Sequence, residues 1–476
     1  MGGSLPSAAI DGATWERVHQ ELVESLRGLI RIPSINPPPP DTPDGELRVA
    51  RRIEDELGAA GVAAEVVEPF PGRGSVGARL RGDGTGGDPL LLLGHLDVVP
   101  ASPELWTHDP FAADVADGYI WGRGAVDMKN LVAMEIAVMR RLAAEARAAG
   151  RDPASDPVPG LTRDVLFAAT ADEEAGGLHG IGWLVDERPE WFQAAGAINE
   201  SGAVATAFGG RRFYPIGVAE KGYAVYRVTV HGTWGHGSMP RDDNAAVRAS
   251  QIVTRLNVQG PPRLTPMMTR FFGGLADNLT GDQARLVRAL ADDDPRLAET
   301  ALDGLCDPMA RRVIRALLRD TVSPNVIHAG VKYNVIPGEA TIEIDCRVLP
   351  GTSEEEMEAA VVARIGPDLA AHCEVELVIF GEPVDAPADS ALYEVLAVTV
   401  RDHDPGGVPL PFMVPFATDA KHLARLGVPA YGFSPLMLDP EEHFLDRFHG
   451  VDERVGLDAL RWGLPVLYDA VRRFCG

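Results

Sequence analysis

The chain of 476 residues is short of cysteine, of long apolar runs and of basic charge. Its cysteines, Cys306, Cys346, Cys373 and Cys475, form no Cys-x-x-Cys pair, which excludes a disulfide framework and a thiolate zinc site. A reducing cytoplasm is the expected location. No run approaches about 18 uncharged apolar residues, and no basic segment precedes an apolar one at the N-terminus, so we expect neither a membrane span nor an export signal.

Acidic residues outnumber basic ones by 69 to 44, which gives a formal net charge of −25. This charge repels the phosphates of nucleic acids and of anionic bilayers, so we expect neither as a partner. The 45% hydrophobic and 24% charged residues are typical of globular proteins and exclude a disordered or coiled-coil chain. At about 150 residues per domain, the length corresponds to about three domains or, more realistically, to two large ones.

Apolar runs bounded by glycine and proline alternate with helical patterns in the first 200 residues. The run 90–93 consists of four leucines between Pro89 and Gly94, as in a strand buried on both faces, although one turn of a buried helix has the same pattern. Residues 127–149 have helical spacing, and a further buried strand is expected at 165–169. This alternation predicts an α/β domain with a mostly parallel sheet.

The pattern changes near residue 217, after which alternating strands at 224–230 and 331–348 flank a helical pattern at 244–256. This part reads as an inserted α+β domain. We therefore expect one domain from residues 1–216 and 384–476 and a second from residues 217–383. Within the insertion, residues 261–323 are charged and helical in pattern.

Polar residues follow the predicted buried strands. His95 and Asp97 come directly after the leucine run, and their i, i+2 spacing places both on one side of an extended chain, at the edge where open α/β sheets bind ligands. A histidine with a carboxylate two residues on fits a metal ligand oriented by a second acid. A polar strand end without function has the same sequence.

Acidic residues recur at the next element ends. Asp127 either caps the helix that it opens or is a ligand. Asp172, Glu173 and Glu174 follow a strand, and three successive acids repel one another unless cations lie among them, although a solvated acidic loop is the alternative. Glu200 follows another strand.

The C-terminal segment adds His449, with Asp452 and Glu453 close behind it. Each of these features is weak alone, but together they place two histidines and several carboxylates at successive element ends. That donor set is typical of zinc, manganese or cobalt rather than of a thiolate-bound metal.

At these positions the sequence resembles the co-catalytic zinc peptidases and deacylases, which include aminoacylase, acetylornithine deacetylase, succinyl-diaminopimelate desuccinylase, glutamate carboxypeptidase and carnosinase-like dipeptidases. The motifs run in order along almost the whole chain: 94–97, 122–129, 172–177, 199–201, 231–238, 334–338 with Arg347, and 449–454. The resemblance implies a catalytic domain with an inserted lid and dimerisation domain.

The resemblance also implies two divalent ions per chain, zinc first and cobalt or manganese as alternatives. One ion is assigned to His95, Asp127 and Glu200, and the other to Asp127, Glu174 and His449, so that Asp127 bridges. Glu173 resembles the general base that activates a water between the ions, and Asp97 resembles the partner that orients His95.

In the inserted domain, His236 resembles the lid residue that stabilises the oxyanion, while Asn334 and Arg347 resemble groups that hold the substrate and its carboxylate. The resemblance further implies a homodimer in which His236 acts on the active site of the neighbouring subunit. His443 is a rival to His449 as the last ligand, but residues 450–453 favour His449.

The implied reaction is hydrolysis of the amide bond of an N-acyl amino acid or small peptide. Some relatives have aspartate at the position of Glu200, and glutamate there leans toward deacylase or carboxypeptidase chemistry, with a dipeptidase as the alternative. A catalytically inactive binding or scaffold protein is a further alternative, against which the retention of Glu173 and of all five ligands argues. A serine hydrolase is not expected, because no Gly-x-Ser-x-Gly elbow is present.

Overall fold

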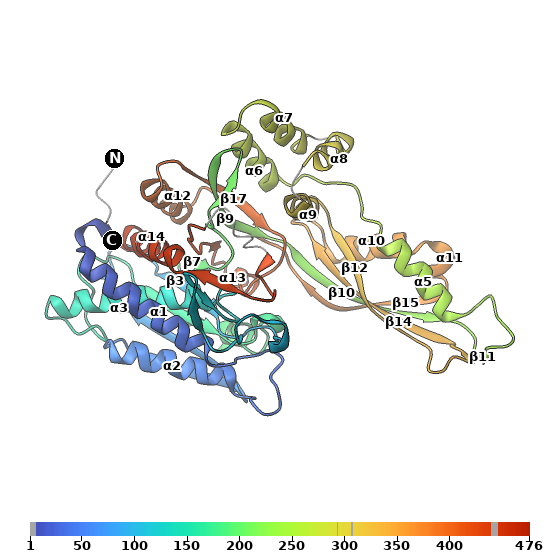
Figure 1. Cartoon of the computed structure of the whole chain (residues 1–476), viewed down its shortest axis with the longest axis horizontal. Helices are drawn as coiled ribbons and strands as arrows, with labels where there is room; N and C mark the ends of the chain where they lie inside the picture. Colours follow the sequence, from blue (N-terminus) through green and yellow to red (C-terminus); the bar gives the residue numbers. More distant parts are fainter. Residues whose placement is uncertain (1–5, 293, 306–307, 439–445) are drawn as a thin grey trace. The chain divides into compact units, whose positions relative to one another are not determined.

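The computed structural model describes residues 6–292, 294–305, 308–438 and 446–476. Two compact units can be distinguished (Figure 1): unit 1 is Met1–Val218, Ala386–Pro411 and Thr418–Gly476, and unit 2 is Ala219–Asp385 and Phe412–Ala417. The sequence-based division assigns residues 412–417 to the first domain, and its two boundaries, at 217 and 384, each lie two residues before those of the structure. Residues 412–414 are the end of β17 (Gly407–Val414), and in unit 2 the Val414 carbonyl accepts a hydrogen bond from the backbone N–H of Lys221.

The sheet of unit 1 confirms the predicted α/β class. Its strands run in the order β1 (Ala64–Phe70), β2 (Arg73–Leu80), β6 (Val165–Thr170), β3 (Leu90–His95), β7 (Gly196–Asn199), β18 (Ala430–Gly432) and β9 (Arg211–Glu220). The central strands β6, β3, β7 and β18 are parallel, and antiparallel strands extend the sheet on both sides. The mostly parallel centre places the carboxyl ends of four strands at one edge.

The leucine run forms β3 and is fully buried, so the helix-turn alternative is wrong. Leu91 and Leu93 pack in a core with α4 (Ile181–Glu187) and α13 (Ala420–Ala424). On β3 these leucines alternate with Leu90 and Leu92, while α3 (Lys129–Ala148) also contacts the strand. Helices on both faces explain why the strand carries no polar alternation.

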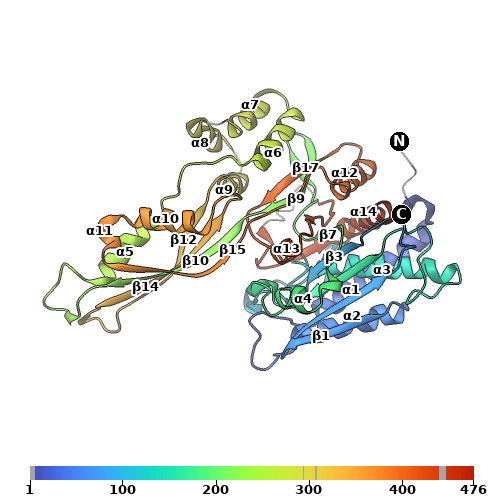
Figure 2. The same cartoon turned by 180° about the vertical axis from the view of Figure 1, so that it is seen from behind.

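Helices α1, α2 and α14 contact α3 (Figure 1 and Figure 2). The other named elements of unit 1 are η1 (Pro6–Ala9), α1 (Gly12–Ile30), α2 (Gly45–Ala59), η2 (Pro103–Leu105), β4 (Asp114–Ala116), β5 (Tyr119–Trp121), η3 (Glu173–Ala175), η4 (Pro189–Trp191), β8 (Thr206–Phe208), α12 (Ala391–His403), β19 (Arg454–Gly456) and α14 (Leu457–Cys475). Strand β17 (Gly407–Val414) crosses into unit 2.

Unit 2 is built on an antiparallel sheet in the order β12 (Thr321–Ala329), β14 (Glu339–Val348), β10 (Gly222–His231) and β15 (Cys373–Gly381). Helices α5 (Ala245–Leu256) and α10 (Glu354–Ile365) share one apolar core with it. The remaining elements are β11 (Gly235–His236), α6 (Pro266–Asp277), α7 (Gly281–Leu290), α8 (Pro295–Asp303), α9 (Pro308–Leu317), β13 (Val335–Ile336), α11 (Pro367–Ala370) and β16 (Val384–Asp385). The helical pattern of 261–323 therefore ends earlier than expected, because Thr321 begins an edge strand.

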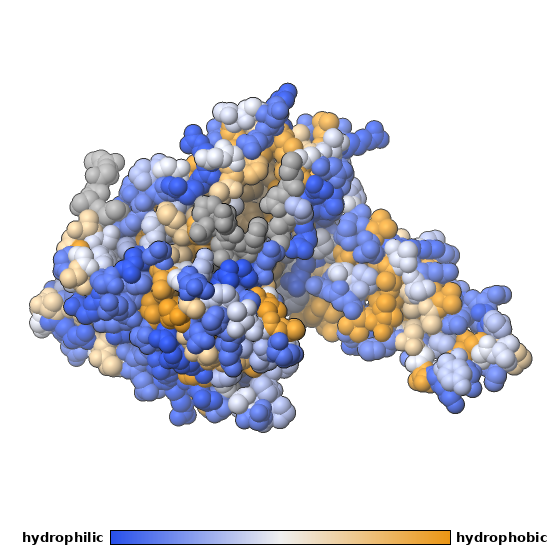
Figure 3. Space-filling model, viewed as in Figure 1, coloured by the Kyte–Doolittle hydropathy of each residue, from blue (hydrophilic) through white to orange (hydrophobic). Residues whose placement is uncertain are grey.

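On the face shown in Figure 3, hydrophilic residues dominate and apolar ones are scattered among them, in keeping with the acidic composition. Among the described residues, no helix has the length and apolarity needed to cross a bilayer.

Candidate metal centre

The carboxyl ends of neighbouring parallel strands bring together the polar residues singled out in unit 1. His95 is the last residue of β3, Glu200 directly follows β7, and η3 places Glu173 and Glu174 just after β6. Because β6, β3 and β7 are adjacent, residues far apart in the sequence meet at one edge of the sheet.

Two groups of possible ligand atoms form there. His95, Asp127 and Glu200 make the first group, and Asp127, Glu174 and His449 make the second; within each group the atoms lie within 4.8 Å of one another. The Nε2 atom of His95 is 3.1 Å from Asp127 Oδ1 and 3.8 Å from Glu200 Oε1. The Nε2 atom of His449 is 3.3 Å from Asp127 Oδ2 and 3.2 Å from Glu174 Oε2.

Asp127 belongs to both groups, with one carboxylate oxygen directed to each histidine. The capping alternative for this residue is wrong, because α3 begins at Lys129 and its N-cap is Met128, which makes no side-chain capping bond. The helix instead starts just beyond the loop that carries Asp127 to the edge of the sheet.

Charges at this edge shift the pKa values of the groups strongly. Burial opposes charge on His95, but hydrogen bonds to Asp127 and Asp97 outweigh it and raise the histidine pKa. Hydrogen bonds to Asp127 and Glu174 raise the pKa of His449 to about 10. Burial raises the pKa of Glu174, since its carboxylate is poorly solvated. The two histidines thus occupy positions where positive charge is favoured.

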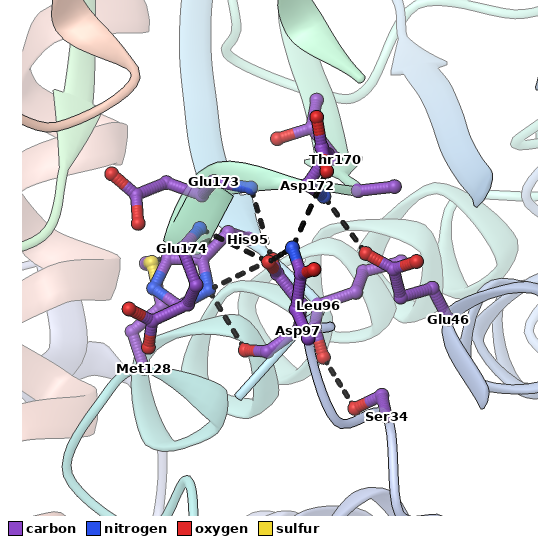
Figure 4. A network of polar contacts seen from close by, with 12 residues as sticks. Ser34, Glu46, His95, Leu96, Asp97, Met128, Thr170, Asp172, Glu173 and Glu174 are labelled. Carbon is purple, nitrogen blue, oxygen red and sulfur yellow. Dashed lines mark hydrogen bonds and ion pairs between the residues drawn. The ribbon is translucent and has the colours of Figure 1, made fainter. Parts of the chain in front are cut away.

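Residues 172–174, which follow β6, are called the acidic loop. Asp97 lies under this loop and contacts it directly (Figure 4). Its carboxylate accepts hydrogen bonds from the backbone N–H groups of Glu173, at 3.1 Å, and Glu174, at 3.0 Å. The Nδ1 atom of His95 lies 3.0 Å from the main-chain carbonyl of Asp97 and 3.5 Å from its carboxylate. Asp97 therefore fixes both the imidazole and the loop that follows β6.

Sequence reasoning missed a buried ion pair that supports Asp127. The Glu453 carboxylate is 2.7 Å from Arg123 Nη1 and accepts the backbone N–H groups of Val126, at 2.7 Å, and Asp127, at 3.1 Å. A second guanidinium nitrogen of Arg123 lies 3.5 Å from the His449 carbonyl. Both charged residues lie in motifs noted in the sequence, but nothing local indicates that they pair.

Replacing Glu453 with glutamine should weaken metal binding by about 10- to 100-fold, the usual effect of removing a group that orients a ligand. The amide keeps the size of the side chain but loses the charge that pairs with Arg123 and one of the two acceptors. Competition with a chelator measures this change, with Glu187→Gln, an exposed acid at the end of α4, as the control. Unchanged affinity would contradict the assigned support.

Within unit 2, the structure brings two of the three expected substrate residues together. His236 on β11 pairs with Val335, and the Asn334 carbonyl accepts a hydrogen bond from the Gly237 N–H at 2.8 Å. The Asn334 side-chain oxygen is buried without a hydrogen-bond partner. Arg347 lies elsewhere, near the end of β14, where it pairs with Asp345 at 3.0 Å.

His443, the rival to His449, lies outside the described residues. The groups in unit 1 fit a pair of divalent ions, since they combine imidazole nitrogens with carboxylate oxygens. An additional observation supports the fit: Glu174 Oε1 is buried and has no hydrogen-bond partner. An oxygen in that state is free to bind a cation.

Comparison with known proteins agrees with this geometry. The profile of "Peptidase family M20/M25/M40" matches residues 91–473. The N-fatty-acyl-amino acid synthase/hydrolase PM20D1 of Xenopus tropicalis is 28% identical over 467 residues, covering 94% of this chain and 84% of that protein. Aminoacylase-1 of Sus scrofa is 32% identical over 237 residues, covering 49% of this chain and 53% of that protein.

A solved structure has the same fold. The M20 family metallo-carboxypeptidase Sso-CP2 of Sulfolobus solfataricus superposes with a TM-score of 0.69 at 17% identity, covering 95% of this chain and 99% of that one. The family match extends over most of the chain and includes every residue of the two ligand groups. The resemblance read from the motifs is thereby confirmed, and the chain belongs to the metal-dependent peptidase family M20/M25/M40.

Proposed function

We propose that the protein hydrolyses the amide bond of N-acyl amino acids or short peptides at a centre of two divalent ions, with zinc as the first choice. One observation carries this proposal: two ligand groups share Asp127, and Glu173 stands next to them without belonging to either. Glu173 is thus available for proton transfer, while its neighbour Glu174 is a ligand.

Bound divalent ions would polarise the amide carbonyl and lower the pKa of water toward about 7. The protein's own contribution begins with Glu173, which accepts a proton from the attacking water and passes it to the leaving amine. Burial raises the pKa of this carboxyl above its ordinary value, while the charges of His95 and Lys421 oppose the shift. A more basic carboxylate is better suited to proton transfer near neutral pH.

The contacts of His236 fit the tautomer that an oxyanion donor needs. The backbone N–H of Ser238 donates to His236 Nδ1 at 3.2 Å, and an acceptor nitrogen carries no proton. In the neutral ring the proton is therefore on Nε2, which can donate to a developing negative charge. The Ser238 hydroxyl, 2.7 Å from the same Nδ1, adds to this restraint.

The separation between His236 and Arg347 supports action across a dimer. His236 pairs with β13, which ends shortly before β14 begins at Glu339. Arg347 lies near the opposite end of β14. At 3.4 Å per residue, Glu339 and Arg347 are roughly 27 Å apart, too far for both ends to touch one small substrate. We propose a homodimer in which Arg347 binds the substrate carboxylate and His236 of the partner subunit serves the same site.

Mixing His236→Ala with Glu173→Ala protein should restore activity, although each variant alone is nearly inactive. A heterodimer then has one site with both intact residues, so up to about half of its sites recover. Subunit exchange is verified with differently tagged chains. Two results would contradict action across the dimer: full activity of wild-type protein that sediments as a monomer, or no recovery of activity after subunit exchange between the two variants. Neither result would affect the proposed metal chemistry.

A substrate panel tests the proposed reaction itself. Zinc-, cobalt- and manganese-loaded protein is incubated with N-acyl amino acids of different chain length, dipeptides and longer peptides, and products are identified by mass spectrometry. Release of a free amino acid from an N-acyl substrate supports a deacylase, and preference for dipeptides supports a dipeptidase. No hydrolysis of any member by the metal-loaded protein would overturn the proposal.

A further inference from the structure

A buried network of hydrogen bonds and ion pairs holds the acidic loop, residues 172–174. Asn36 Nδ2 donates to Asp97 Oδ2 at 2.8 Å and to Asp172 Oδ1 at 3.3 Å. Glu46, on α2, accepts the backbone N–H of Asp172 at 2.8 Å. Asp97 in turn accepts the N–H groups of the next two residues. Every residue at the start of the loop is therefore tied to this network.

Arg73, the first residue of β2, is the cation of this network. Its guanidinium is 2.7 Å from Glu46 Oε2, 3.4 Å from Asp172 Oδ1 and 2.9 Å from the Asn36 side-chain oxygen. The side chains of Glu46 and Asp172 are only 4% and 2% exposed. Carboxylates buried this close repel one another unless a cation compensates them, and the planar fork of arginine can bind several acceptors at once.

The backbone conformation of Asp172 also depends on these contacts. Asp172 has φ of +72°, in the left-handed region that residues with a side chain rarely adopt. Such a conformation persists when surrounding contacts fix it. The backbone N–H of Asp172 donates a hydrogen bond to Glu46. Its carboxylate is held by three further contacts, which come from Asn36, Arg73 and the backbone N–H of His179. The residue that follows is Glu173.

We infer that Arg73 is a positioning residue for Glu173: it holds Glu46, Asn36 and Asp172 so that the proposed base stays at a fixed place beside the ligand groups. The inference rests on the proposed function of Glu173. Arg73 acts through the backbone of the loop, so its removal should change proton transfer more than substrate binding. A misplacement of a catalytic group by about 1 Å costs as much as a hundredfold in rate.

A double-mutant cycle between Arg73 and Glu173 tests this role. Arg73→Met should lower kcat by roughly tenfold to a hundredfold with KM little changed, measured at saturating zinc with metal content checked. In a Glu173→Gln background the same substitution should lower the residual kcat less than about twofold, because no base is left to position. Arg73→Lys keeps the buried positive charge but lacks the planar guanidinium group, so its kcat should lie between those of the wild type and Arg73→Met. If Arg73→Met folds poorly, Arg73→Lys replaces it in the double-mutant cycle with Glu173→Gln.

Arg79→Met is the matched control, since Arg79 lies on the same strand and pairs with Asp164 at the surface, with 54% of its side chain exposed. Its kcat should equal that of the wild type. If the Arg73 substitution lowers kcat by the same factor in both backgrounds, its role is merely structural and the inference is overturned. If Glu173→Gln alone keeps wild-type kcat, the general base of the proposed function is wrong and the inference fails with it, so the two failures are distinguishable.

Discussion

Replacing Glu173 with glutamine should lower kcat by about a hundredfold or more, the range that general-base catalysis supplies, while both metal ions stay bound. Glutamine keeps the shape of the side chain and cannot accept the proton. Neither ligand group contains Glu173, so the number of bound ions has no reason to change. Steady-state assays measure kcat, and elemental analysis of the same sample measures the number of bound metal ions per chain.

Glu187→Gln again serves as the control, because it removes an exposed carboxylate from the helix that follows the acidic loop. Its kcat and metal content should match those of the wild type. If Glu173→Gln instead loses one or both ions, Glu173 is a ligand, and the division of labour between the adjacent glutamates is wrong.

Replacing Asp127 should remove both ions together. Its two carboxylate oxygens are directed to different histidines, so alanine or asparagine at this position deprives both groups of a charged ligand. His95→Ala and His449→Ala should each weaken mainly one site, because each histidine belongs to one group. Chelator titration of metal content separates these outcomes, and asparagine preserves the size of the side chain if alanine disturbs the loop.

Identical metal loss in the variants of Asp127, His95 and His449 would contradict the shared-ligand arrangement. Such a result would mean that the two groups bind metal as one unit, or that a single ion is held by all of them. Circular dichroism on each variant distinguishes loss of ligands from loss of fold.

Local patterns in the sequence were enough to predict a mostly parallel sheet and its two buried strands at 90–93 and 165–169. The leucine run has breakers on both sides, and the position of His95 directly after it follows from the chain alone. The strand Thr321–Ala329 was missed, because it contains Pro324 and follows a long helical pattern. It lies at the edge of its sheet, where a proline is tolerated.

Asp97, two residues after His95, is the one supporting group that the sequence predicts. The rest of the support could not be predicted, because it depends on contacts between distant segments. Asn36 and Asp172 are 136 residues apart, and Arg123 and Glu453 are 330 residues apart. Each is an ordinary polar residue in its own segment, and only the folded chain reveals a partner. For Asp127, helix capping is the more common local explanation, and only the helix boundary at Lys129 excludes it.

Metal titration of the wild-type protein tests the central claim most directly. Protein freed of metal with a chelator is titrated with zinc while hydrolysis of an N-acyl amino acid from the panel is followed. The two ligand groups predict that binding saturates at two ions per chain and that activity rises from near zero to its maximum as they fill. Full activity in metal-free protein, or saturation of both binding and activity at one ion per chain, would contradict a shared two-ion centre.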